Sequence, residues 1–209
     1  MNGKFISFEG GEGSGKSTQL KLLAAAFERS GLPFIATREP GGVASAERIR
    51  SLLVSGDGDA WNPLSETLLF QAARSEHISK KIAPALADGK TIICDRFVDS
   101  TIVYQGIGKG LGVEYIKNLH RLVFGNFMPH LTIILDIDPN VGLRRAGERL
   151  SDETRFEGLS IEFHQKIREG FLQIAQDEKS RCAVLNAAQE PEKLHNDILQ
   201  VISERLGLF

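Results

Sequence analysis

Cysteine, tryptophan and net charge are all scarce in this chain of 209 residues. The scarcity of cysteine and of net charge excludes several kinds of site and partner. There are two cysteines, Cys94 and Cys182, and one tryptophan. Both cysteines lie in short apolar runs, where a thiol usually behaves as a small buried hydrophobe, so neither a disulfide framework nor a cysteine metal site is expected. Lys and Arg total 25 against 27 Asp and Glu, a net charge of −2. No whole-molecule field therefore attracts nucleic acid or an anionic membrane, and any phosphate affinity must be local.

Long hydrophobic runs are also missing. No segment approaches the about 18 apolar residues of a membrane span, and the opening MNGKFISFEGG shows neither the apolar stretch nor the cleavage site of a secretory signal. We therefore expect a cytoplasmic protein with no membrane or nucleic-acid partner. Repeats, low-complexity tracts and linkers are absent as well, which favours a single domain spanning residues 1–209.

What the sequence does contain is a regular alternation of two patterns. Runs rich in Val, Ile, Leu and Phe predict buried parallel strands at 4–8, 33–37, 91–94, 131–137 and 182–186. Helical spacing predicts helices at 16–30, 45–55, 63–88, 112–124, 139–149, 157–178 and 191–206. Asn62 before Pro63 is typical of a helix N-cap followed by proline at the first helical position. The alternation predicts an α/β fold, with a five-stranded parallel sheet flanked by helices on both faces.

A glycine-rich loop follows the first predicted strand and opens the first predicted helix. It matches G-x-x-x-x-G-K followed by Ser or Thr, the phosphate-binding P-loop. Lys16 is expected to reach the β- and γ-phosphates of ATP, and the Ser17 hydroxyl to hold Mg²⁺. P-loops also occur in switches, motors and transporters, so the motif alone does not define the reaction. The expected ATP-binding residues are Gly10, Gly11, Glu12, Gly13, Ser14, Gly15, Lys16, Ser17 and Thr18.

Charged residues also follow the second and third predicted strands, at the sheet edge where α/β proteins bind ligands. Asp95 is expected to orient Mg²⁺ or its waters, and Arg96 to neutralise phosphates where donor and acceptor meet. The alternative is a surface ion pair between these two neighbours. Arg38 lies in TREPGG, where a polar turn explains the glycines but not the arginine.

Two further groups of residues suggest an acceptor site and a mobile flap. Phe70 and Arg74 are four apart on one predicted helix, as a stacked and hydrogen-bonded base requires, although an isolated Phe is more often a core residue. Arginines at 144, 145, 149 and 155 lie in a predicted lid at about 144–156. They either form a solvated face or stabilise charge on the transferring phosphoryl group. Arg149 is our first choice for that catalytic role.

These motifs together resemble those of bacterial thymidylate kinases over nearly the whole chain. The matching stretches are FEGGEGSGKST, TREPGG, LLFQAARSEH, CDRF-x-x-S-T-x-x-YQG and the stretch from GLRRAGER to TRFE. The resemblance implies a P-loop nucleoside-monophosphate-kinase fold, transfer of the ATP γ-phosphate to dTMP, a need for Mg²⁺ and a homodimer. It also implies that the lid supplies the basic residues, because the P-loop has no arginine.

The resemblance further implies roles for residues around dTMP. Phe70 would stack on thymine, Arg74 would donate to a base carbonyl, and Thr101 would lie at the N3 edge of the base. The remaining implied residues are Arg38 and Arg96 at the dTMP phosphate, Tyr104 where a ribose 2′-hydroxyl would fit, Ser100 and Gln105 nearby, and Glu12 at the 3′-hydroxyl.

Two rival functions remain open at this level. One is a P-loop kinase for another small acceptor, such as a different nucleoside monophosphate or shikimate. The pairs Phe70/Arg74 and Tyr104/Gln105 argue against it. The other is a nucleotide-dependent switch, but the sequence lacks the Asn-Lys-x-Asp and Asp-x-x-Gly elements of guanine-nucleotide switches.

Overall fold

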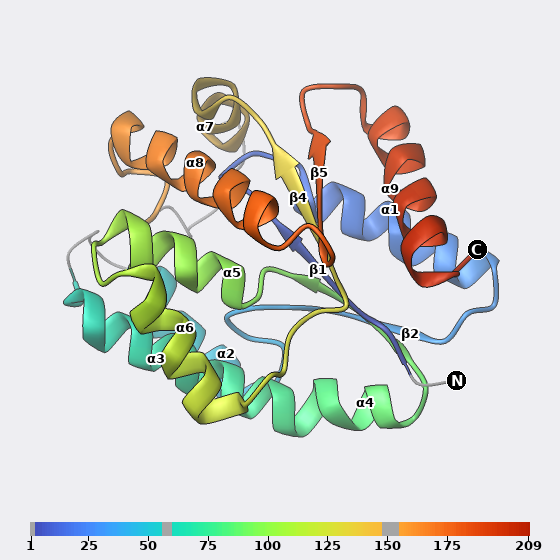
Figure 1. Ribbon diagram of the computed structural model, residues 1–209, viewed down its shortest axis with the longest axis horizontal. Coiled ribbons are helices and arrows are strands. Elements are labelled where there is room, and N and C mark those ends of the chain that lie inside the picture. Colours follow the sequence, from blue (N-terminus) through green and yellow to red (C-terminus); the bar gives the residue numbers. More distant parts are fainter. Residues whose placement is uncertain (1–2, 56–59, 148–154) are drawn as a thin grey trace.

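A five-stranded parallel sheet forms the centre of the molecule (Figure 1). The computed structural model describes residues 3–55, 60–147 and 155–209. The strand order is β2-β3-β1-β4-β5, and every adjacent pair is parallel. The predicted sheet is therefore confirmed, with strand ends within one residue of the expected ones. The strands are β1 Phe5–Glu9, β2 Phe34–Arg38, β3 Thr91–Asp95, β4 Leu131–Asp136 and β5 Cys182–Asn186.

Helices cover both faces of this sheet. The α-helices are α1 Lys16–Arg29, α2 Ala44–Val54, α3 Pro63–His77, α4 Ala83–Ala87, α5 Val98–Thr101, α6 Val113–Phe124, α7 Pro139–Gly147, α8 Ile161–Asp177 and α9 Pro191–Leu206. Two π-helical segments, η1 Ile78–Ile82 and η2 Ile102–Gly108, continue α3 and α5. Within the described ranges, no helix has both the length and the hydrophobicity needed to cross a membrane.

The helical predictions need correction in three places. The helix expected at 157–178 begins only at Ile161, after a turn, and its N-cap is Ser160. The expected helix at 63–88 is a succession of α3, η1 and α4, and the Asn62 side chain caps it by accepting from the Ser65 amide at 2.9 Å. The helical segment from Val98 to Gly108 was not predicted, because its β-branched and glycine residues disfavour helix. Its apolar side chains pack against one face of the sheet, and the free energy of this burial outweighs the low helix propensity of the segment.

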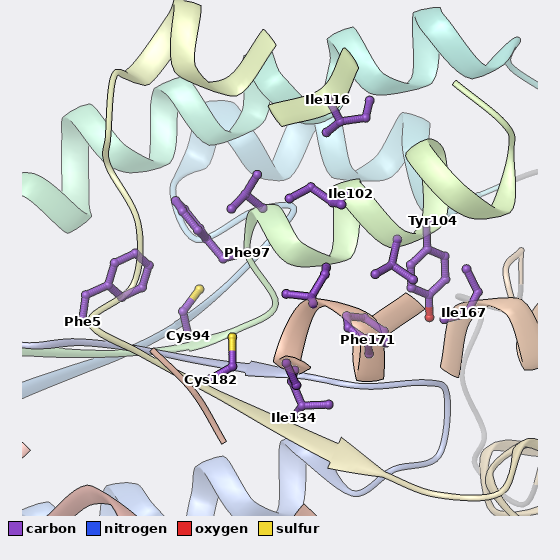
Figure 2. Packing of buried hydrophobic residues seen from close by; sticks show 14 of the residues in the cluster. Phe5, Cys94, Phe97, Ile102, Tyr104, Ile116, Ile134, Ile167, Phe171 and Cys182 are labelled. Atoms are coloured by element: carbon purple, nitrogen blue, oxygen red, sulfur yellow. The ribbon is translucent and has the colours of Figure 1, made fainter. Parts of the chain in front are cut away.

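Along each strand, alternate side chains belong to two separate hydrophobic layers, one on each face of the sheet. Phe5 and Ile92 point to the layer formed with α5, η2, α6 and α8, in which Cys94 and Cys182 are buried free thiols (Figure 2). Ile6 and Phe8 point to the opposite layer, formed with α1 and α9. This alternation is the expected consequence of the two-residue period of a strand buried on both faces.

Parallel pairing places the carboxyl ends of all strands at one edge. The glycine-rich loop follows β1 there, the segment Glu39-Pro40-Gly41-Gly42 follows β2, and Arg96 follows β3. The Glu39–Pro40 peptide bond is cis. Motifs that are far apart in the sequence thus meet at the edge where open α/β sheets bind ligands.

Candidate active site

The loop from Gly10 to Gly15 joins β1 to α1, whose N-terminus it leads into. Gly13 has φ 67° and Gly15 has φ 89°, a left-handed conformation that favours glycine. A Cβ atom on Gly13 would also collide with the backbone of Gly142 in α7. Glycine is therefore required at position 13 both by its conformation and by the close approach of α7. The loop presents backbone amides at a helix N-terminus, where anions bind well.

Lys16 is the first residue of α1, and its side chain crosses the loop. Its Nζ donates to the Gly10 carbonyl at 3.1 Å, the Gly11 carbonyl at 2.9 Å and Ser14 Oγ at 3.2 Å. Burial and the nearby Arg96 charge lower the pKa of Lys16 to about 8, against the opposing effect of Glu12 and Asp95. The ammonium is therefore held at the mouth of the phosphate loop.

Ser17 and Asp95 bring two oxygen groups together beside Lys16. Ser17 Oγ donates to Asp95 Oδ2 at 3.2 Å, although 78 residues separate them. Magnesium favours oxygen ligands and is commonly held by one or two protein groups together with substrate phosphates. The pair therefore fits the donor set that Mg²⁺ requires. Among the described residues there is no cluster of three or more His, Cys, Asp or Glu side chains suited to a metal.

Arg96 lies between the phosphate loop and the segment that follows β3. Its Nη2 is 2.8 Å from Glu12 Oε1, and its Nη1 donates to the Gly10 carbonyl and to Ser100 Oγ, each at 3.1 Å. The guanidinium also lies over the ring of Tyr104, 5.2 Å from the ring centroid. Arg96 is thus held by Glu12 in a largely buried position, rather than forming the alternative surface pair with Asp95.

Glu12 is the one acidic residue of the phosphate loop, and the structure explains its presence there. It pairs with Arg96, and the Tyr104 hydroxyl donates to the same oxygen, Oε1, at 2.8 Å. Burial by itself would raise the pKa of Glu12, but Arg96, Lys16 and the Tyr104 hydroxyl lower it to about 2. Glu12 is therefore a charged carboxylate that positions two neighbouring side chains.

Glu9, at the end of β1, is a contributor that the sequence reasoning missed. Its Oε1 accepts from the Phe97 amide at 2.7 Å and its Oε2 from Ser100 Oγ at 2.5 Å. Arg96 immediately precedes Phe97 and has a left-handed φ of 66°, which is strained for a non-glycine residue. Burial and the nearby Asp99 raise the pKa of Glu9 to about 8. The sequence signal that could have revealed Glu9 is an acidic residue at the end of a largely apolar strand.

Phe70 and Arg74 lie one turn apart on α3, as predicted, and both line the same pocket. Phe70 is only half-buried, so it is not the core residue of the alternative interpretation. Arg74 is 2% exposed and donates through its Nε to Glu39 Oε2 at 2.8 Å. Its two other nitrogens donate to Gln71 Oε1 at 2.9 Å and Thr101 Oγ1 at 3.0 Å. The guanidinium is therefore fixed in one orientation beside Phe70.

Glu39 is a second residue whose part the sequence did not reveal. This buried carboxylate holds Arg74 with one oxygen, and its other oxygen lies 3.0 Å from His77 Nδ1. The opposite His77 ring nitrogen is 2.7 Å from Thr37 Oγ1. A chain of polar contacts therefore ties the segment after β2 to α3 and orients Arg74.

A single pocket of about 690 Å³ contains both the phosphate loop and the predicted acceptor residues. Arg38 lies at its rim, half-exposed, with its Nη2 3.0 Å from Glu47 Oε2. Of the predicted ATP-binding residues, Thr18 is exposed and outside the lining, and Gly10 and Gly11 line a small cavity behind the loop. The predicted acceptor residues in the lining are Glu12, Arg38, Phe70, Arg74, Arg96, Ser100, Thr101, Tyr104 and Gln105.

The predicted lid arginines separate into different environments. Arg144 and Arg145 belong to α7, and Arg145 Nη1 donates to the Ala187 carbonyl at 3.0 Å. Arg155 is 5% exposed, with its Nη2 2.5 Å from Glu66 Oε2 and its Nη1 2.8 Å from the Leu53 carbonyl. Arg155 is therefore not part of a solvated face. Arg149 lies outside the described residues.

This fold and pocket define a class of protein: a P-loop phosphotransferase of the nucleoside-monophosphate-kinase fold, with the phosphate loop and the predicted acceptor residues lining one pocket. The thymidylate kinase family model matches residues 8–198. The chain is 48% identical over 206 residues to a thymidylate kinase of Caulobacter vibrioides, covering 99% of each chain. It is 46% identical to one of Symbiobacterium thermophilum, covering 97% of this chain and 94% of that one.

A solved structure agrees with these sequence matches. The crystal structure of thymidylate kinase from Ehrlichia chaffeensis superimposes with a TM-score of 0.77 at 37% identity, covering 97% of this chain and 99% of that one. The chain belongs to the thymidylate kinase family.

Proposed function

We propose that the 690 Å³ pocket binds ATP and dTMP together and transfers the γ-phosphoryl group between them. The reaction of the family, phosphorylation of dTMP to dTDP, is the reaction of this chain. The observation that carries the assignment of residues is the position of Arg96. It contacts the phosphate loop at Gly10 and Glu12, and it also contacts Ser100 and Tyr104 on the acceptor side.

The acceptor end of the pocket suits a pyrimidine deoxynucleotide. Phe70 offers an aromatic face for stacking, while Arg74 and Thr101 offer polar atoms at its edge. Tyr104, whose hydroxyl donates to Glu12, would fill the space of a 2′-hydroxyl, and Glu12 would accept from the 3′-hydroxyl. Arg38 and Arg96 would bind the dTMP phosphate, and their planar guanidinium groups suit that task.

The chemistry needs no nucleophile from the protein. An anionic oxygen of the dTMP phosphate attacks the γ-phosphorus, the bond from this phosphorus to the bridging oxygen breaks, and ADP leaves. Lys16 and Arg96 offset the negative charge that spreads over the transferring group. Ser17 and Asp95 would hold Mg²⁺, which when bound neutralises further phosphate charge. Positioning of the two substrates supplies the rest of the acceleration.

Arg149 is proposed as the lid residue that acts on the transition state. The phosphate loop carries no arginine, and two of the other lid arginines, Arg145 and Arg155, already have backbone or carboxylate partners. An arginine that reaches the γ-phosphoryl group only during transfer would raise kcat without strengthening ATP binding.

We also propose a homodimer in the cytoplasm. Apolar side chains are exposed on two helices that both pack on η2: Leu64 and Leu68 on α3, and Tyr115 and Leu122 on α6, with Leu122 85% exposed. Such side chains favour contact with a second copy. Sedimentation velocity at micromolar concentration tests the dimer, and a purely monomeric boundary would contradict it.

The cytoplasmic location is supported by the free, buried thiols of Cys94 and Cys182, which suit a reducing compartment.

The experiment that tests the proposed function is a coupled assay of ADP release with dTMP, dUMP, UMP, CMP, GMP and AMP as acceptors. The expected result is rapid turnover with dTMP, slower turnover with dUMP and little with the others. Turnover of ATP without any acceptor would favour the switch alternative, and preference for another acceptor would favour a different kinase.

A further inference from the structure

Glu66 is a fully buried carboxylate on α3 that lies behind the pocket and is not part of its lining. Its Oε1 accepts from Gln105 Nε2 at 2.7 Å. Its Oε2 is 2.8 Å from Lys109 Nζ and 2.5 Å from Arg155 Nη2. Three donors therefore converge on one buried group: Gln105 in η2, Lys109 at the C-terminal end of the same segment, and Arg155 from the segment before α8. Gln105 also lines the pocket.

The chemistry of Glu66 determines which way the Gln105 side chain is turned. An ionised carboxylate only accepts hydrogen bonds, so the NH₂ end of the Gln105 carboxamide must face Glu66. The carbonyl oxygen, Oε1, is then the polar atom that the same carboxamide offers to the pocket. The orientation follows from the partner's chemistry and not from the similar shapes of the amide nitrogen and oxygen.

We propose that Glu66 is a positioning residue that sets base selectivity by holding the Gln105 carboxamide with its oxygen toward the acceptor base. An oxygen there accepts from the N3–H of thymine or uracil. Cytosine has a lone pair at N3 in place of this N–H. Its N3 would therefore face the Gln105 oxygen, which is also an acceptor, and no hydrogen bond would form. This inference deepens the proposed function and rests on it, because it assumes that the base lies beside Phe70, Arg74 and Gln105.

The two cations make a sharp prediction for Glu66→Gln. Lys109 and Arg155 both donate to the position of Oε2, so the new amide oxygen must lie there. The new NH₂ group then faces Gln105, which has to turn over and present its oxygen to residue 66. The pocket now meets the base with an NH₂ donor in place of an acceptor. The substitution at residue 66 therefore changes the group that Gln105 presents to the base from a hydrogen-bond acceptor to a donor.

The test is the ratio of kcat/KM for dTMP to that for dCMP. We expect Glu66→Gln to lower this ratio about 10- to 100-fold, mainly through weaker dTMP binding, because a buried polar group without its partner is penalised by that order. Glu66→Asp keeps an acceptor-only group and should largely preserve the ratio. The matched control is Glu76→Gln, on the same helix but paired with Lys80 and Ser45, and it should leave the ratio unchanged.

A double-mutant cycle with Gln105→Met separates positioning from general damage. If Glu66 acts through Gln105, adding Glu66→Gln to Gln105→Met should not change the ratio further. An unchanged ratio in Glu66→Gln, or an equal drop in the presence and absence of Gln105, overturns the proposal. Failure of the unaltered protein to phosphorylate dTMP would instead overturn the proposed function.

A measurement on the unaltered protein decides the matter if the variant does not fold. The side-chain NH₂ signals of Gln105, assigned by their loss in Gln105→Met, should show nuclear Overhauser contacts to the Glu66 methylene protons. They should show none to bound dTMP. Contacts between these NH₂ protons and the base would overturn the proposal.

Discussion

Tyr104 offers a demanding test of the proposed sugar site, because one side chain combines two roles that can be separated. Tyr104 is 5% exposed, and its ring lies edge-on to Phe156, Phe163 and Phe171, with centroids 5.6 to 6.3 Å away. Figure 2 shows it among the buried side chains of one hydrophobic layer. Its hydroxyl donates to Glu12. Tyr104→Phe removes the hydroxyl alone, and Tyr104→Ala removes the ring as well.

The magnitudes follow from these contacts. Tyr104→Phe loses one hydrogen bond to a carboxylate that keeps Arg96, so we expect a stability loss of about 1–2 kcal/mol. Tyr104→Ala empties a packed aromatic site and should cost about 3–5 kcal/mol. At about 2–4 °C per kcal/mol for a chain of this size, both variants should remain folded at 25 °C with distinct melting temperatures.

Sugar selectivity should respond to the ring and not to the hydroxyl. Burying a 2′-hydroxyl against the ring without a partner is penalised by about 1–3 kcal/mol, or roughly 10- to 100-fold in kcat/KM. Tyr104→Phe should therefore retain the preference for dUMP over UMP, while Tyr104→Ala should narrow it. Steady-state kinetics with both acceptors, together with thermal unfolding, provide the measurement. Equal kcat/KM for dUMP and UMP in the unaltered protein would refute the reasoning, as would a Phe variant as unselective as the Ala variant.

The remaining predictions concern charge. Lys16→Ala should lower kcat by about 10²–10³-fold with little change in melting temperature, and near-native turnover would show that the phosphate loop has been misassigned. Arg149→Ala should lower kcat with little change in KM for ATP; a loss confined to KM would make the lid a binding clamp. Arg155→Ala should instead destabilise the fold by about 2–3 kcal/mol, because it removes one of the two cations that bind the buried Glu66, which keeps Lys109; unaltered denaturant unfolding would contradict this. The pKa of Glu12 falls from 4.5 to about 2 on folding, so it contributes about 3 kcal/mol above pH 4.5 that is lost between about pH 4.5 and 2. Glu12→Gln should lack this acid dependence in denaturant unfolding, and an unchanged dependence would assign it to other groups.

Local chemistry explains why much of the architecture could be predicted. Buried strands flanked by turns leave continuous apolar runs, and the Asn62–Pro63 cap leaves a signature that needs no tertiary information. Once the strands are parallel, their carboxyl ends must meet at one edge. The convergence of Lys16, Asp95 and Arg38 in one pocket was therefore predictable: Arg38 and Asp95 end β2 and β3, and Lys16 follows the loop after β1.

The helical segment from Val98 to Gly108 shows where local reasoning fails. Its β-branched residues and glycines favour other conformations, yet it forms α5 and η2 and carries Thr101, Tyr104 and Gln105 into the pocket. Burial of its apolar side chains against α6 and α8 decides its structure. A short sequence window contains no record of that burial.

By itself, the sequence determined the sheet, the phosphate loop and the edge where ligands bind, because periodicity and turn chemistry act over a few neighbouring residues. Only the tertiary structure decided how the buried carboxylates are used. Glu9 meets Ser100, Glu39 meets Arg74, and Glu66 meets Gln105 across 91, 35 and 39 residues of chain. Each pairing gives a buried carboxyl group a hydrogen-bond partner, without which its burial would be penalised, and the pairing depends on which elements pack together rather than on any local pattern.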